Sequence, residues 1–467
     1  MDKILLLNPP GDKLFQRDMY CSGVSKAHYY WPSIDMLVLS GILGQEYDLD
    51  ILDAIAERLT PEESWEKIQQ CDYKAVIFLT GIASWKQDFA FIARLNKHKR
   101  LPLIIGNGDV LLYDAKKFLN EYAYLDAVLF DYTSEDILLY LRGEFDGISS
   151  MAFRNGGGIE FRKREIKPGE FSFPVPQHEK FPLKKYLLAH GRRFPFTTVM
   201  TNFGCPFTCS FCPASVLNFK YRAVENVMEE LRYVASLGIK EVFFTDFTFE
   251  ARRQNTLKLC RQIVEENLDI SWACSSRANS LDEELLGWMK RAGCHTMLLG
   301  VESGDDELLK RYSKGVNKTQ IRRGFALCRK FKIRTLGHFI IGLPGETEET
   351  VRKSIEFAKE IDCDIASFNI AVPALGTSLR EAALKHGWLK EEVMEFDASE
   401  TYPTLETPEF SRQQAWEWRN RAVREFYFRP SYLFKIAVSS KSFYQWKILI
   451  LNGWAVLKSS IKRGKSR

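Results

Sequence analysis

Three cysteines stand within eight residues, in the stretch Cys205-Pro206-Phe207-Thr208-Cys209-Ser210-Phe211-Cys212. Thiolates this close together can face one inorganic centre. A structural zinc site normally needs four ligands, often as two separated pairs, and no second pair lies near these three. Three thiolates can hold a [4Fe–4S] cluster that keeps one iron open, because cysteine is the usual protein ligand of such clusters. We therefore expect Cys205, Cys209 and Cys212 to bind a cluster, with a zinc or purely structural site as the alternative.

The overall composition is typical of a globular protein with hydrophobic cores. A chain of 467 residues, 45% apolar and 27% charged, is long enough for two or three domains. Its first residues lead directly into an apolar run and do not resemble a signal peptide. Ten cysteines without such a signal favour a reducing compartment, so we expect a cytoplasmic protein. The scattered cysteines are expected to be small buried residues: Cys21, Cys71, Cys260, Cys274, Cys294, Cys328 and Cys363.

Residues 196–390 alternate short apolar runs with helical patterns, which predicts six β/α units. When such units form a barrel, the chemistry sits at the carboxyl ends of the strands. Polar or glycine-rich stretches fall there: Asp246, then Ser276 and Arg277, then residues 300–304 and residues 342–347. The expected strands are 197–200, 241–245, 270–274, 296–300, 335–341 and 365–370, and the expected helices are 224–237, 252–266, 282–292, 306–311, 319–331 and 347–361.

The cysteine spacing, with Phe211 before the last cysteine, resembles the signature of the radical S-adenosylmethionine (SAM) enzymes. The stretches at the strand ends also resemble their counterparts in that superfamily. The resemblance implies a partial (β/α)6 barrel in which the cysteines hold a [4Fe–4S] cluster whose open iron binds SAM. It implies that Arg277, Glu302 and Ser303 contact the ribose or methionine part of SAM. It also implies that the backbone at Gly342 contacts the adenine, with Phe211 against the adenine ring, and that Asp246 belongs to the SAM site.

Each of these residues also has a purely structural alternative. Asp246 or Glu302 could cap a helix N-terminus, a position that carboxylates favour. Arg277 could pair with an acid at the rim of the barrel. The glycines and proline of residues 342–345 require a turn whether or not it contacts adenine.

The first 145 residues alternate five apolar runs with helical patterns. The runs are apolar on both faces, as parallel strands covered by helices must be. This predicts a doubly wound (Rossmann-like) domain whose ligand lies beyond the carboxyl ends of its strands, where Asn8, Thr80, Gly106 and Gly108 fall. The expected strands are 4–7, 49–52, 75–79, 102–105 and 127–130, and the expected helices are 33–44, 61–70, 87–98, 115–122 and 135–141.

Residues 7–10, 52–54, 104–108 and 125–128 resemble the cobalamin-binding domain that precedes the barrel in one large radical SAM subfamily. The resemblance implies a corrin over Asn8, Thr80, Gly106 and Gly108, because a flat macrocycle needs backbone without side chains near it. The sequence departs from the pattern where Asn107 interrupts the glycines and where residues 131–135 contain none. The missing Asp-x-His-x-x-Gly motif implies a corrin without histidine on its lower face. The alternative is a domain that has kept the fold and lost the corrin.

Residues 146–195 predict a connector with a hairpin, formed by 150–154 and 159–162 and followed by prolines.

Residues 391–467 predict a helical basic extension: from Arg412 onward, the sequence contains thirteen Lys and Arg but only two Asp and Glu. The apolar run 446–457 is too short to cross a bilayer. Mixed aromatic and basic residues suit contact with an anionic membrane surface. The alternative is a helix packed on the barrel with a basic end, and we expect no nucleic-acid partner, because no recognised module accompanies the charge.

The resemblance predicts a cobalamin-dependent radical SAM methyltransferase that acts on an unactivated carbon of a small-molecule or lipid substrate. In such enzymes the reduced cluster cleaves SAM to a 5′-deoxyadenosyl radical, which removes a hydrogen atom, and methylcobalamin then supplies the methyl group. The electron comes from an external donor such as flavodoxin or ferredoxin. Two alternatives stand beside this prediction: a radical SAM cyclase, oxidase or rearrangement enzyme without cobalamin, and a non-catalytic iron–sulfur protein.

Overall fold

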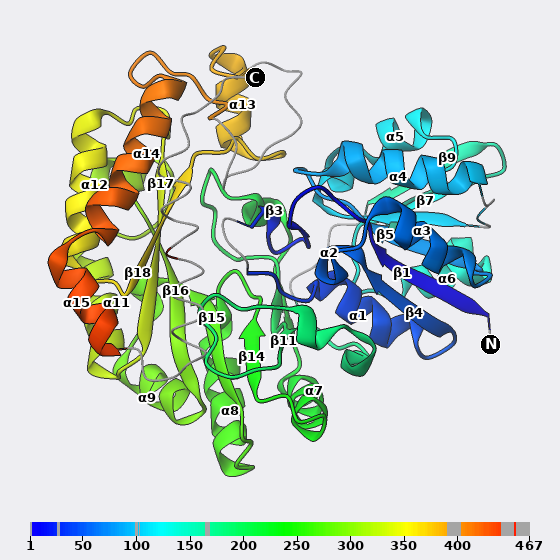
Figure 1. Cartoon of the computed structure of the whole chain (residues 1–467), viewed down its shortest axis with the longest axis horizontal. Coiled ribbons are helices and arrows are strands. Elements are labelled where there is room, and N and C mark those ends of the chain that lie inside the picture. Colours follow the sequence, from blue (N-terminus) through cyan, green and yellow to red (C-terminus); the bar gives the residue numbers. More distant parts are fainter. Residues whose placement is uncertain are drawn as a thin grey trace.

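The computed structural model describes residues 2–25, 29–98, 101, 103–163, 169–389, 403–439 and 453. Figure 1 shows two α/β domains, the first at the right in blue and cyan and the second at the left in green to orange. Each domain is built on a mainly parallel sheet with helices around it. The predicted α/β fold class, with a doubly wound domain before a partial barrel, is confirmed.

The first sheet has five parallel strands in the order β4-β1-β5-β6-β7, the arrangement of a doubly wound domain. Successive residues of β1 face opposite layers. Leu6 packs in the cluster that contains α1 and α6, while Leu7 packs in the cluster that contains α4 and α5. The strands are β1 (Lys3–Asn8), β4 (Asp48–Asp53), β5 (Ala75–Leu79), β6 (Ile104–Asn107) and β7 (Ala127–Leu129), and the helices are α1 (Ile34–Leu43), α2 (Ala54–Glu57), α3 (Pro61–Gln69), α4 (Trp85–His98), α5 (Asp109–Glu121) and α6 (Asp136–Arg142).

The hairpin expected after the first domain extends this same sheet. Its strands β8 (Ser150–Asn155) and β9 (Gly158–Lys163) are antiparallel, and β8 pairs antiparallel with β7. Some boundaries differ from the sequence expectation by two residues or more. Strand β6 begins two residues later and α4 two residues earlier, and α5 begins at Asp109, with a kink at Asp114 where φ is −147°. Gly108 is the single residue between β6 and α5 and is the N-cap of the helix, so no loop separates the two elements.

The second sheet has six parallel strands in chain order, β11-β14-β15-β16-β17-β18, so it curves into an open barrel with edges at β11 and β18. All six predicted strands and six predicted helices are present. The strands are β11 (Phe196–Val199), β14 (Glu241–Phe244), β15 (Ser271–Ser276), β16 (Cys294–Glu302), β17 (Arg334–Ile341) and β18 (Ile365–Ile370), and the helices are α7 (Val224–Ser236), α8 (Arg253–Glu265), α9 (Glu283–Arg291), α10 (Asp306–Arg311), α11 (Lys318–Lys330) and α12 (Glu348–Glu360).

A segment of the first domain fills part of the barrel interior. It follows β1 and includes the short strands β2 (Phe15–Arg17) and β3 (Ser22–Val24). The ring of Trp31 lies 5.7 Å from that of Phe243 on β14, and the hydroxyls of Tyr20 and Ser275 lie 2.5 Å apart. The two domains therefore share one continuous hydrophobic cluster.

The chain after the barrel forms α13 (Ser378–Lys385), α14 (Arg412–Tyr427) and α15 (Pro430–Ser439). Helix α14 covers the last barrel strand beside α12 (Figure 1), and Tyr427 Oη donates to the carbonyl oxygen of Ala366 at 2.8 Å. This helix lies within the helical extension predicted for residues 391–467, and Ser411 and Gln414 form its capping box. The apolar run 446–457 lies outside the described residues apart from position 453. In the part of the chain that the structure describes, no helix is both long and apolar enough to cross a membrane.

Candidate functional site

The three cysteines lie on a loop that is closed at its base by a short hairpin. Strand β12 (Asn202–Phe203) pairs antiparallel with β13 (Lys220–Arg222), and residues 204–219 between them carry the thiols. The loop begins at Gly204, whose φ is +71° and where a Cβ would lie 2.5 Å from the carbonyl oxygen of Asn218. Only glycine enters this turn without strain. The backbone N–H of Cys212 donates to the carbonyl of Cys209 at 3.1 Å and closes a turn between them, and all three cysteines line one cavity.

Two carboxylates hold the base of the loop. Asp246, at the end of β14, accepts the backbone N–H groups of Thr201 and Asn202 at 2.8 and 2.7 Å. Its burial raises the pKa of the carboxyl to about 7. Asp131, from the first domain, accepts from Lys220 Nζ at 2.6 Å. The loop is therefore fixed to both domains before any ligand binds.

A cavity of about 450 Å³ lies between the two domains at the carboxyl ends of the barrel strands. This volume is in the lower part of the range of about 300–1,000 Å³ that is usual for ligand sites. Its barrel side includes all three cysteines with Phe211, Arg277 and Glu302. Its other side comes from the first domain and includes Tyr20, Ser22, Ile82, Asp109, Leu112 and Tyr113.

Lys314 links Arg277 to Glu302 close to the cysteine thiols. Arg277 Nη1 lies 3.5 Å from Cys209 Sγ, and its guanidinium lies 3.9 Å from the ring centre of Phe207. Its other terminal nitrogen donates to the backbone carbonyl of Lys314. Lys314 Nζ in turn donates to Glu302 Oε1 at 2.7 Å.

Glu302 stands at a bulge where β16 slips against β17, and its φ is +66°. This is a sparsely populated conformation for a residue with a side chain, and such strain is common at functional sites. The side chain is only 10% exposed, and Glu302 lines the cavity. The sequence expectation that Glu302 contacts a ligand here stays a prediction that the geometry permits.

Three of the residues expected at the SAM site do not line the cavity. Asp246 is fully buried against the loop backbone. Ser303 Oγ accepts the N–H of Asp305 at 3.1 Å and lies 3.3 Å from the hydroxyl of Ser354, so it helps to start α10. Gly342 takes a left-handed φ of +92°, and its N–H donates to Glu346 Oε2 at 2.5 Å; the cavity is lined by its neighbour Leu343.

The chemistry of the donor set fits an iron–sulfur cluster. In the described residues, no group of three or more His, Cys, Asp or Glu side chains is arranged to hold a metal ion. Three thiols that line one cavity are the usual ligands of a larger cluster. Burial raises the pKa of the Cys212 thiol to about 12 and also raises that of Cys205, so binding of iron would displace their protons.

The first-domain residues predicted to contact a corrin are buried within that domain. Asn8 and Thr80 are both 0% exposed and bind the ion pair of Arg17 with Asp88, whose charged atoms are 2.6 Å apart. A Cβ on Gly108 would lie 1.7 Å from the carbonyl oxygen of Thr80. A Cβ on Gly106 would lie 2.6 Å from Cδ1 of Leu111, the end of a flexible side chain. These residues therefore shape the sheet edge, and the cavity wall itself is made by the residues that follow them.

Sequence reasoning missed several cavity residues. Ile82 and Asp109 follow the ends of β5 and β6 and could have been found from that position. The N–H of Ile82 donates to Asp109 Oδ1 at 2.9 Å, and burial raises the pKa of Asp109 to about 6. Tyr20 and Lys314 carried no signal, because neither belongs to a periodic pattern or a motif.

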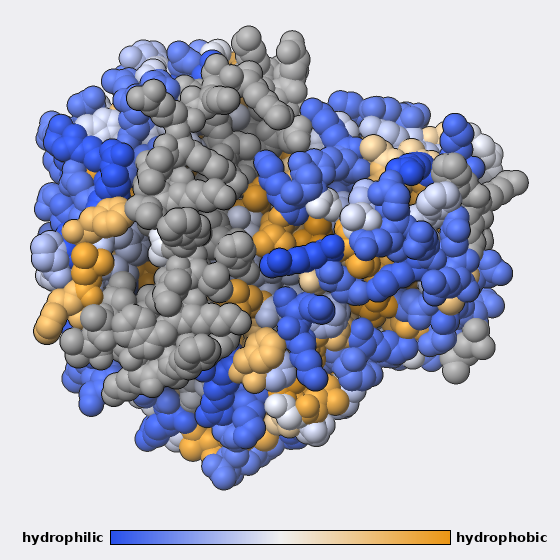
Figure 2. Space-filling view, in the orientation of Figure 1, coloured by the Kyte–Doolittle hydropathy of each residue, from blue (hydrophilic) through white to orange (hydrophobic). Residues whose placement is uncertain are grey.

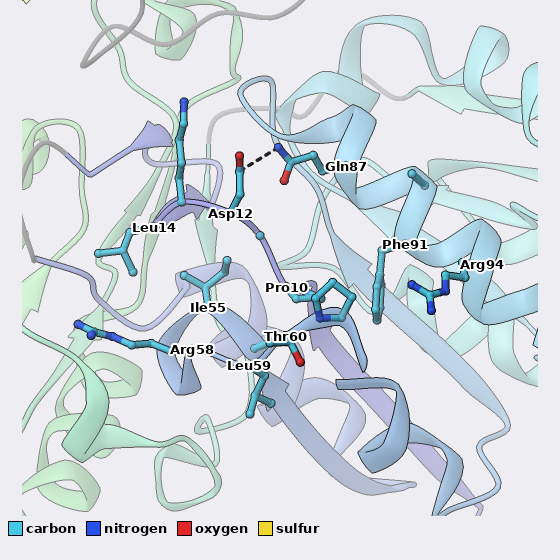
Figure 3. A pocket seen from close by; sticks show the side chains of 15 residues that line it. Pro10, Asp12, Leu14, Ile55, Arg58, Leu59, Thr60, Gln87, Phe91 and Arg94 are labelled. Atoms are coloured by element: carbon cyan, nitrogen blue, oxygen red, sulfur yellow. Dashed lines mark hydrogen bonds between the residues drawn. The ribbon is translucent and has the colours of Figure 1, made fainter. Parts of the chain in front are cut away.

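A second, more open cavity of about 840 Å³ lies on the first domain beyond the ends of β1 and β4. Figure 3 shows Pro10, Ile55 and Phe91 around it, with Arg58 and Arg94 at its edge. Arg94 Nη1 donates to Glu62 Oε1 at 2.9 Å, so one of these cations is already paired. The residues that line this cavity do not include the cysteines.

Comparison with known proteins agrees with this geometry. A family model described as the radical SAM superfamily matches residues 199–358. Over 450 residues the chain is 30% identical to an uncharacterized methyltransferase of Pyrococcus horikoshii, which covers 93% of this chain and 94% of the relative. It is 25% identical to an anaerobic magnesium-protoporphyrin IX monomethyl ester cyclase of Rubrivivax gelatinosus, over 77% of this chain and 68% of that one.

Two solved structures share the whole architecture. The radical SAM methyltransferase TsrM from Kitasatospora setae, with cobalamin and a [4Fe–4S] cluster bound, superposes with a TM-score of 0.69 at 15% identity, over 98% of this chain and 99% of that one. The cobalamin-dependent SAM radical enzyme OxsB, with aqua-cobalamin bound, gives a TM-score of 0.69 at 15% identity, over 98% of this chain and 72% of that one. At these identities the likeness shows the fold.

Proposed function

The chain belongs to the radical SAM superfamily, and from this premise we propose that it is a cobalamin-dependent methyltransferase acting on a carbon atom of a small molecule or lipid. The observation that carries the proposal is the cavity between the domains. The three cysteines and the residues that follow strands β5 and β6 line the same space. Chemistry that needs both a cluster and a corrin requires such a shared space.

When bound, the cluster with SAM supplies a carbon-centred radical, and the corrin supplies a methyl group. The chain's own residues would position them. Cys205, Cys209 and Cys212 would hold the cluster, while Asp246 and Lys220 keep their loop in place. The buried pair of Glu302 and Lys314 offers polar atoms for SAM, and the apolar remainder of the cavity excludes water.

The proposal that the protein binds a corrin is supported by the side of the cavity that the first domain forms. Ile82, Leu112 and Tyr113 give this wall a broad apolar surface, and Asp109 is its carboxylate. Such a surface suits a flat macrocycle whose side arms carry amides. Asn8, Thr80, Gly106 and Gly108 would act from behind the wall, by fixing the strand ends.

The other partners are proposed on chemical grounds. Apolar cavity residues such as Met19, Leu298, Ile340 and Leu375 favour a substrate with an apolar body. Reduction of the cluster needs an external one-electron donor such as flavodoxin or ferredoxin. We place the enzyme in the cytoplasm, where thiols stay reduced.

We also propose a peripheral membrane contact through α15. Leu433 and Phe434 on this helix are 53 and 73% exposed, and Phe428, just before it, is 49% exposed. Figure 2 shows an orange band at the left edge, where α15 lies in Figure 1. The sequence from Lys435 to the last residue contains eight Lys and Arg and no Asp or Glu. Apolar and basic residues together favour an anionic lipid surface.

A second candidate is a radical SAM enzyme of the cyclase type without cobalamin. It is favoured by the similarity to the anaerobic cyclase of Rubrivivax gelatinosus and by the absence of glycine from residues 131–135. Both candidates need the cluster and SAM, so only the corrin separates them.

The test is made on protein purified without oxygen from cells supplied with cobalamin. Its absorption spectrum, iron content and corrin content are measured, together with 5′-deoxyadenosine formed from SAM. About one corrin per cluster is the expected result. A cluster that forms 5′-deoxyadenosine but binds no corrin after reconstitution would leave the cyclase-type enzyme as the function.

A further inference from the structure

Arg277 makes an unusual set of contacts for a buried cation. It follows β15 and is only 6% exposed. Its guanidinium contacts the ring of Phe207, the sulfur of Cys209 and the backbone carbonyl of Lys314. Two of these partners belong to the cysteine loop itself, so Arg277 is attached to the loop and not only to the barrel wall.

None of these contacts is a carboxylate. Among the described residues, no acid lies within ion-pair distance of the Arg277 guanidinium, and its Nε is a buried nitrogen without a hydrogen-bond partner. Four other buried cations pair with an acid: Arg17 with Asp88, Arg222 with Glu230, Lys220 with Asp131 and Lys314 with Glu302. An unpaired buried charge is costly unless an anion compensates it.

A cluster on Cys205, Cys209 and Cys212 would supply that negative charge. Three thiolates give an oxidised [4Fe–4S]²⁺ cluster a net charge of −1, and uptake of one electron makes it −2. Hydrogen bonds to the sulfurs and nearby net charge are among the factors that set the reduction potential of such clusters. A guanidinium 3.5 Å from Cys209 Sγ acts on both.

We propose that Arg277 is a positioning residue for the cluster, which hydrogen-bonds the Cys209 sulfur and raises the cluster's reduction potential. The inference rests on the proposed cluster site and deepens it. It assigns Arg277 to the cluster in place of SAM, to which the family resemblance would assign it. The ring of Phe207 holds the guanidinium against the loop, where Nη1 reaches the Cys209 sulfur.

The experiment compares cluster potentials in the full-length chain without SAM. Reconstituted protein is titrated with dithionite as the one-electron donor, and the reduced cluster is followed by electron paramagnetic resonance. Arg277→Gln removes the charge, and Arg277→Lys keeps the charge but loses the planar fork. Arg252→Gln is the matched control, because this exposed cation stacks on Tyr221 at the loop base, 4.0 Å from the ring centre, without lining the cavity.

The expected result is a midpoint potential more negative in Arg277→Gln than in the unaltered protein, an intermediate value in Arg277→Lys and no change in Arg252→Gln. Equal potentials in all four proteins, with SAM affinity lost only in the Arg277 variants, would overturn the inference and assign the residue to SAM. If Arg277→Gln cannot retain iron, the same comparison is made with Arg277→Lys and Phe207→Leu. Absence of a cluster from the unaltered protein would instead contradict the proposed function.

Discussion

Lys220 Nζ lies 2.6 Å from Asp131 Oδ2, and this contact joins the base of the cysteine loop to the first domain. The two side chains are 10 and 5% exposed. The ammonium also lies 4.8 and 5.0 Å from the ring centres of Phe171 and Phe203. The loop after the fifth strand, which lacks the glycines of the family pattern, thus carries a carboxylate that reaches the cluster loop.

Removing either partner of this pair should be strongly destabilising. Lys220→Met or Asp131→Asn leaves a buried charge without its counter-ion, at a cost of about 3–5 kcal/mol. The double variant should lose less than the sum of the two, because it leaves no unpaired charge. Chemical denaturation of all four proteins measures the coupling. The exposed pair of Lys353 and Glu349 is the control, expected to give about 0–1 kcal/mol, and additive losses at Lys220 and Asp131 would contradict the prediction.

Each loop cysteine should be required for the cluster. Cys209→Ala is expected to abolish bound iron and 5′-deoxyadenosine formation, since two thiolates cannot hold the cluster in place. Iron content and product are measured on the same anaerobic preparation. Cys260→Ala, a fully buried core cysteine outside the loop, should retain both. Full iron and activity in Cys209→Ala would remove the basis of the proposed site.

Gly108→Ala should destabilise the first domain more than an ordinary glycine replacement. Its φ is +149°, and a Cβ would lie 1.7 Å from the carbonyl oxygen of Thr80. Gly157 also has a positive φ, +90°, but has nothing within 4 Å of a Cβ. The difference between Gly108→Ala and Gly157→Ala in free energy of unfolding isolates the clash, and we expect about 1–3 kcal/mol. Equal losses would show that the strand end can shift to make room.

Glu346 should make stability depend on pH. Its side chain is fully buried, and burial raises the pKa of the carboxyl from 4.5 to about 8. Between these values the folded chain holds a proton that the unfolded chain has lost, so the free energy of unfolding falls as pH rises through this window, by up to about 1.4 kcal/mol per pH unit.

Chemical denaturation of the iron-free protein between pH 5 and pH 8 measures how its free energy of unfolding depends on pH. Glu346→Gln should show a flatter profile, because its amide does not titrate. Glu349→Gln, whose side chain is 78% exposed, is the control and should follow the unaltered protein. Parallel profiles for all three proteins would exclude Glu346 as the source.

Helix α15 should bind vesicles that contain anionic lipid. The full-length chain is expected to sediment with phosphatidylglycerol vesicles and not with phosphatidylcholine vesicles, and added salt should weaken binding by screening the basic residues. Replacing Leu433 and Phe434 by Ser should reduce binding, whereas Leu237→Ser, at an exposed apolar residue elsewhere, should not. Equal sedimentation with both kinds of vesicle would contradict the proposed contact.

The sequence predicted the architecture because both domains repeat a local pattern. Apolar runs and helical periodicity located the parallel strands of both sheets, and the cysteine spacing located the loop. Tertiary contacts were out of reach: Lys220 and Asp131 are 89 positions apart. Gly108 was predicted to contact a corrin, whereas the neighbour that a Cβ would meet in the folded chain is the carbonyl oxygen of Thr80, which no sequence pattern reveals.

The functional residues divide in the same way. Motif positions such as Cys209 and Glu302 do line the cavity, whereas Asp246 and Ser303 turn toward the backbone that supports it. A motif records which residues a family retains but does not distinguish contact with a ligand from support of the loop. Burial and hydrogen-bond partners make that distinction.

The segment that fills the barrel interior has a consequence for biosynthesis. Tyr20 and Trp31 leave the ribosome long before Phe243, the ring against which both pack. The nascent first domain must therefore expose these aromatic rings until the barrel strands have been translated. A first domain produced without the barrel would keep these rings exposed, because the surface that covers them comes from the second domain.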